Sequence, residues 1–162
     1  MSDLNPIRTP CIGVCSTGIG DAVCRGCKRF AHEVIDWNGY SQAQKGAIDS
    51  RLDRFLAMCV ANKFRIVDQK LLDWQLSMQK IRHQPHHDSY CHLFALLKAG
   101  ATQIAQPEQY GFEVLPSCRD MTLMALRDQI DEEFWILSSA HYDRYIATGD
   151  LVADESPQEA LR

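Results

Sequence analysis

Four cysteines lie within the first thirty residues of the 162-residue chain, in two close pairs. Three residues separate Cys11 from Cys15, two separate Cys24 from Cys27, and eight lie between the pairs. Structural zinc sites use pairs separated by about two to four residues, and four thiolates complete the tetrahedral shell of one ion. We therefore predict that Cys11, Cys15, Cys24 and Cys27 bind one metal ion, which gives this glycine-rich segment its shape.

The spacing of the pairs favours zinc as the bound metal, because it differs from the cysteine spacings of ferredoxins. A single iron ion in four thiolates has the same tetrahedral geometry, so an iron–sulfur cluster and mononuclear iron are the alternative cofactors. Four thiolates also leave a negative charge on a divalent ion. We expect Arg25, Lys28 and Arg29, which lie beside the second pair, to offset that charge.

A metal ion with four protein ligands has no coordination position open to a substrate. We therefore favour a binding protein over an enzyme: a zinc-stabilised protein-interaction or adaptor module with an unknown protein partner. Iron would instead indicate a redox protein or sensor. A third possibility is a nucleic-acid-binding zinc module that uses the basic residues near the cysteines, namely Arg8, Arg25, Lys28 and Arg29.

The charge of the chain disfavours nucleic acid as the partner. Seventeen lysines and arginines face twenty-one acidic residues, for a net charge of −4. Residues 1–59 are close to neutral and the remainder is acidic, so no strong basic field attracts phosphates. No apolar run reaches the ~18–20 residues of a membrane span, and the N-terminus lacks a signal-peptide pattern. We expect a cytoplasmic protein without membrane contact, where clustered cysteines are more often metal ligands than disulfides.

Histidines between the expected helices raise the question of a second metal site. The group consists of His83, His86, His87, Cys91 and His92. From the sequence, these residues could be either metal ligands or solvated loop residues. Of the isolated cysteines, we expect Cys59 and Cys91 in the core and Cys118 as the most exposed thiol.

Residues 9–56 resemble a bacterial family, the domain of unknown function 1289. The resemblance rests on Pro10-Cys-Ile-Gly-Val-Cys15, on Val23-Cys-Arg-Gly-Cys27, on Glu33, Ile35 and Trp37, and on a capped helix that ends Arg51-Leu-Asp-Arg54. It implies that the four cysteines are ligands, and the family's members are often labelled predicted iron–sulfur proteins. Lys28 departs from the usual pattern, since glycine is the more common residue after a close cysteine pair.

The rest of the sequence predicts a mainly α-helical fold: an N-terminal four-cysteine metal knuckle followed by four or five helices packed as a small bundle. We divide the chain into a metal-binding module with short helices (1–59) and a helical domain (60–162). Apolar residues at helical spacing predict a short helix from Phe30, then helices that begin after Ser41, Asp68 and Asp88 and near Met121.

The connections between these helices are expected to be irregular. Residues 63–68 alternate like a strand, but no partner is apparent, so we predict an extended link there and a loop over 110–117. Gly149 is the expected end of the last helix, and the final dozen residues are polar and expected to fray. Aromatic residues on the last helix suggest a homodimer face, made of Phe134, Trp135, Tyr142 and Tyr145.

Overall fold

The computed structural model describes residues 6–148 and is mainly α-helical, as predicted. The α-helices of this part are α1 (Ala31–Asp36), α2 (Gln42–Ala61), α3 (Gln69–Met78), α4 (Ser89–Gly100) and α5 (Leu123–Tyr142), and the strands are β1 (Phe64–Ile66) and β2 (Phe112–Val114). Short 3-10 turns cover Ser16–Ile19, Trp37–Gly39, Pro107–Tyr110 and Pro116–Cys118, and a π-helical turn covers Asp143–Ala147. Gly149 and the final dozen residues lie outside the described residues. Along residues 6–148, no helix combines the length and apolar character needed to cross a bilayer.

Polar side chains at the helix starts explain where the helices begin. The hydroxyl of Ser41 accepts a hydrogen bond from the backbone N–H of Gln44 at 3.1 Å, and the Gln44 side chain accepts one from the N–H of Ser41 at 2.9 Å. This is the predicted capping box of α2. The carboxylates of Asp68 and Asp88 cap α3 and α4 by accepting hydrogen bonds from the N–H groups of Leu71 and Tyr90. The predicted starts of these three helices are therefore confirmed.

The expectation of irregular links was wrong at two segments, which form a small sheet. β1 pairs antiparallel with β2, and Phe64 lies opposite Val114. The sheet continues past β1, because the carbonyl of Gly111 accepts hydrogen bonds from the N–H groups of Val67 and Asp68 at 2.9 and 3.0 Å. Each strand has only three residues and stands far from its partner along the chain, so sequence pattern alone did not pair them.

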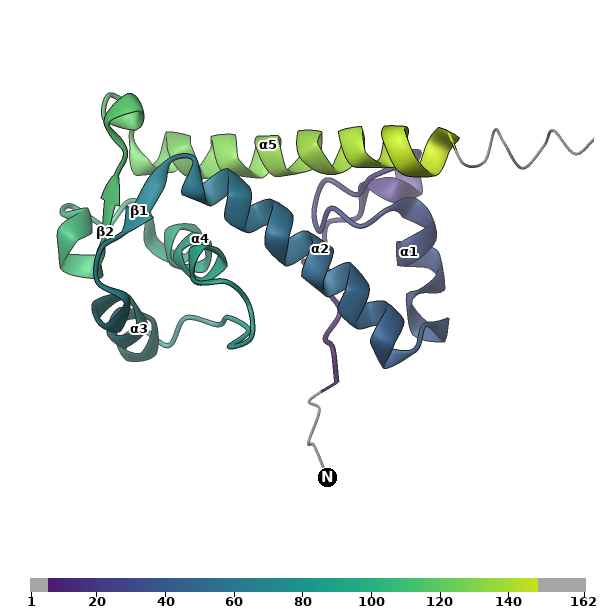
Figure 1. Ribbon diagram of the computed structural model, residues 1–162, viewed down its shortest axis with the longest axis horizontal. Helices are drawn as coiled ribbons and strands as arrows, with labels where there is room; N and C mark the ends of the chain where they lie inside the picture. Colours follow the sequence, from purple (N-terminus) through teal and green to yellow (C-terminus); the bar gives the residue numbers. More distant parts are fainter. Residues whose placement is uncertain (1–5, 149–162) are drawn as a thin grey trace, which may run out of the picture.

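One core joins the N-terminal helices to the rest of the molecule. The side chains of Leu52 and Phe55 on α2 belong to the same buried cluster as Leu97 on α4 and Ile130 on α5. In Figure 1, α5 runs along one side of the molecule, with α3, α4 and the sheet near its beginning and the cysteine segment and α1 near its end. The last helix thus packs against both parts of the chain. The division at residues 59 and 60 stays a prediction.

Candidate metal centre

Cys24 and Cys27 lie on a tight turn closed by two backbone hydrogen bonds. The N–H of Lys28 donates to the carbonyl of Cys24 at 2.8 Å, and the N–H of Cys24 donates to the carbonyl of Arg29 at 2.9 Å. Lys28 has a φ of 63°, in the left-handed region that glycine adopts freely and that costs another residue about 1–2 kcal/mol. The lysine therefore holds the conformation for which the sequence led us to expect glycine.

Backbone N–H groups converge on the sulfur of Cys24. Burial alone raises the pKa of this thiol, but hydrogen bonds from the N–H groups of Cys27, Ser16 and Gly26 outweigh burial and lower the pKa to about 7. These dipoles favour the thiolate, which is the form that binds metals. At Cys27 burial dominates and raises the pKa, against an opposing hydrogen bond from Nε of Arg29 to the sulfur at 3.2 Å.

Gly26 brings the two cysteine pairs into backbone contact. A Cβ atom placed on Gly26 would lie 2.2 Å from the carbonyl oxygen of Val14, in the segment of the first pair. The Cys24 thiol lies 3.5 Å from the same oxygen and donates to it. Only a residue without a side chain fits here, so the glycine between the second pair of cysteines sets how closely the first pair approaches.

Cys11 and Cys15 lie on the exposed side of this contact. The sulfur of Cys11 accepts a hydrogen bond from the N–H of Gly13 at 3.4 Å, and the sulfur of Cys15 lies 3.1 Å from the hydroxyl of Thr17. Among the described residues, no three of the four sulfurs lie within 4.8 Å of one another. A tetrahedral zinc site, with bonds of about 2.3 Å, requires sulfurs about 3.8 Å apart. The donor set fits a thiolate-binding metal, and one ion bound by all four thiolates requires the sulfurs to lie closer together than they do here.

The basic residues beside the second pair mostly contact α5. The guanidinium of Arg25 lies 3.9 Å from the ring centre of Trp135 and 3.5 Å from the carboxylate of Glu132. The ammonium of Lys28, whose side chain is buried, pairs with Asp131. The indole N–H of Trp135 donates to the carbonyl of Val23 at 3.0 Å.

These contacts have two consequences for the sequence-based expectations. Of the three residues expected to offset the charge at the metal, Arg29 is the one hydrogen-bonded to a cysteine sulfur. Two of the aromatic residues suggested as a dimer face contact the cysteine segment of the same chain, since Phe134 lies under the ammonium of Lys28 and Trp135 under Arg25.

The histidine group divides into two sets. His83 and His92 bond to backbone carbonyls, and the Cys91 thiol donates to the carbonyl of Asp53 at 3.2 Å. His86 and His87 instead contact the carboxylate of Asp49 on α2, a residue that the sequence did not single out. Cys59 and Cys91 are buried as expected. The expectation for Cys118 was wrong, because the 3-10 turn at Pro116–Cys118 places this thiol in the core.

Residues 9–55 match a protein family described as "Protein of unknown function (DUF1289)", and this agrees with the resemblance seen in the sequence. The match covers the cysteine segment, α1 and most of α2. No curated protein and no solved structure shows significant similarity to the chain. The clustered cysteines and the family match are both compatible with metal binding at the N-terminal segment.

Proposed function

We propose that the protein is a non-catalytic metal-binding module, in which Cys11, Cys15, Cys24 and Cys27 hold one ion and the resulting surface binds another protein. Zinc is the favoured metal, because the two pairs have the spacing of structural zinc sites. We place the protein in the cytoplasm, where the thiols stay reduced.

The turn at Cys24 and Cys27 carries this proposal. It lowers the pKa of the Cys24 thiol toward the thiolate form that binds metals, and it holds Gly26 against the carbonyl of Val14. The exposed first pair then completes the shell, and the binding energy becomes folding energy for residues 9–30.

Exposed apolar side chains beside the cysteines support a protein partner. Ile12 is 55% exposed, Val14 is 59% exposed, and Ile19 is 87% exposed. Each would bury apolar area in an interface, and the core of a protein interface is where such residues gather. Arg25 and Lys28 are engaged with carboxylates of α5, and this favours a protein over a nucleic acid as the partner.

Iron is the second candidate, and it would make the module a redox protein or sensor. The observation that favours it is the hydrogen bonding at the sulfurs of Cys24 and Cys27, because N–H groups that point at sulfur also tune iron–thiolate centres. The two candidates differ in colour. Protein purified without air would be red or brown with iron and colourless with zinc.

The test compares the wild type with Cys24→Ser and with Cys118→Ser, a buried cysteine outside the proposed site. Cobalt(II) added to the reduced wild type should give intense sulfur-to-cobalt absorption, and elemental analysis of anaerobically purified protein should identify the native metal. Cys24→Ser should lose the sulfur-to-cobalt absorption and the order of residues 10–30, while circular dichroism shows most helix retained. If Cys24→Ser binds cobalt like Cys118→Ser, with an unchanged spectrum, the four-cysteine site is wrong.

A further inference from the structure

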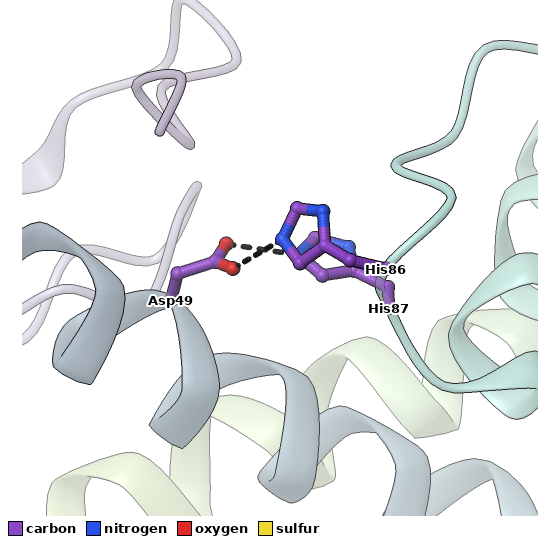
Figure 2. A group of neighbouring side chains, drawn as sticks. All are labelled: Asp49, His86 and His87. Carbon is purple, nitrogen blue, oxygen red and sulfur yellow. Dashed lines mark hydrogen bonds and ion pairs between the residues drawn. The ribbon is translucent and has the colours of Figure 1, made fainter. Parts of the chain in front are cut away.

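Asp49, His86 and His87 come together from two separate elements. Asp49 lies on α2, and the two histidines lie in the link between α3 and α4. Nε2 of His86 lies 2.7 Å from one oxygen of the Asp49 carboxylate, and Nε2 of His87 lies 2.8 Å from the other. Figure 2 shows both imidazole rings directed at this carboxylate.

The link that carries the histidines is anchored on both sides. The carboxylate of Asp53, one turn further along α2, accepts a hydrogen bond from the N–H of Asp88 at 2.9 Å. The ring of His92 bonds to the carbonyl of Gln84 at 2.8 Å, and the N–H of His87 donates to the same carbonyl at 3.0 Å. The link that carries the two imidazoles is therefore held by contacts other than their bonds to the carboxylate.

The three ligand atoms have the separations that one metal ion requires. One oxygen and two nitrogens, one from each side chain, all lie within 4.8 Å of one another. Ligands bonded at about 2.0–2.2 Å to the same ion sit about 3 Å apart, close to the two nitrogen–oxygen distances found here. Two imidazoles and one carboxylate are also the set that binds first-row transition metals with positions left open.

We propose that Asp49, His86 and His87 bind a divalent transition-metal ion such as Zn²⁺ or Fe²⁺ at a site separate from the four cysteines. His87 and Asp49 line a cavity of about 650 Å³, whose wall also includes Cys27 and Lys28. The cavity gives the ion an entry path and leaves room for water or another small ligand at the open positions.

The experiment uses the full chain, reduced, with zinc alone as the probe. Long-range proton–nitrogen NMR of the imidazoles should show Nε2 of His86 and His87 binding zinc, with His83 and His92 unaffected. Calorimetry should count one more zinc ion bound by the wild type than by His86→Gln or Asp49→Asn. Alternatively, these variants should bind that ion with an affinity lowered by about tenfold or more. His86 is exposed, so His86→Gln keeps the fold even if Asp49→Asn does not.

His83→Gln is the matched control, since His83 lies in the same link but bonds to the carbonyl of Ile81 and packs against the ring of His92. The proposal is overturned if zinc leaves the signals of His86 and His87 unchanged, or if His86→Gln binds zinc like His83→Gln. Zinc bound at the cysteines does not change these imidazole signals. Failure of the four-cysteine proposal would therefore leave the response of His86 and His87 to zinc intact.

Discussion

Substitution of Gly26 by alanine tests whether close approach of the two cysteine pairs is needed for metal binding. The added Cβ would lie 2.2 Å from the carbonyl oxygen of Val14, whereas such contacts are essentially never closer than 3.0 Å. The two segments must therefore move apart by about 0.8 Å. Overpacking of this kind costs about 1–3 kcal/mol.

Without metal the two segments can separate and relieve the clash, whereas the metal-bound form must keep sulfurs from both pairs at one ion, so the cost falls mainly on the metal-bound form. We expect Gly26→Ala to weaken zinc binding by about 5- to 150-fold, since each 1.4 kcal/mol is about a factor of ten. Competition of zinc with a chromophoric chelator measures this affinity. Urea unfolding of the metal-free protein measures the part of the cost that is independent of metal.

Gly18→Ala is the matched control. Gly18 lies in the same segment, has no atom within 4 Å of an added Cβ, and needs no left-handed backbone. It should bind zinc like the wild type. Equal zinc affinities for Gly26→Ala and Gly18→Ala would refute the idea that the contact between Gly26 and Val14 sets the geometry of the site.

Two further predictions concern the packing around α1 and the end of α5. Glu33→Gln removes the charge that pairs with the largely buried Arg51 at 2.5 Å, so urea unfolding should show a loss of about 3 kcal/mol in the free energy of unfolding. Glu113→Gln, which breaks an exposed ion pair with Arg65, should lose less than about 1 kcal/mol. Burial, together with the positive charges of Arg51 and Arg54, holds the pKa of His141 below 6.5 in the folded protein. The unfolded chain therefore binds more protons than the folded one at low pH, and stability falls as the pH drops below 6.5. His141→Phe should lose less stability than the wild type between about pH 7 and pH 5, and equal losses would remove His141 as a cause.

Local signals in the sequence predicted the helices well. Ser41, Asp68 and Asp88 mark helix starts because a capping side chain bonds to backbone only two or three residues away. The sheet was missed because a three-residue strand has no stability by itself, and its partner is identified only by the fold. The left-handed backbone of Gly111, with φ 83°, helps join the strands, yet in the sequence it indicated only a loop.

For the candidate sites too, the sequence revealed the local features and not the contacts between distant parts of the chain. The spacing of Cys24 and Cys27 marked them as a pair, because the turn that holds them involves only a few consecutive residues. Asp49 gave no signal, since a carboxylate on a helix face looks like any solvated charge until the link with His86 and His87 folds over it. The contacts of the cysteine segment with α5 were equally invisible, because they join residues more than a hundred positions apart.

The long stretch of chain between the cysteine segment and α5 affects how the protein is made. The bond between Trp135 and the carbonyl of Val23 spans 112 residues, so it cannot form until α5 has been synthesised. At ~5–20 residues per second, the thiols spend roughly 6–20 s outside the ribosome before the helix that anchors their segment exists. During this interval the cysteine segment lacks its contacts with α5. If the four thiols bind metal as we propose, an expression host short of the ion during translation would yield a cysteine segment that is both unloaded and disordered.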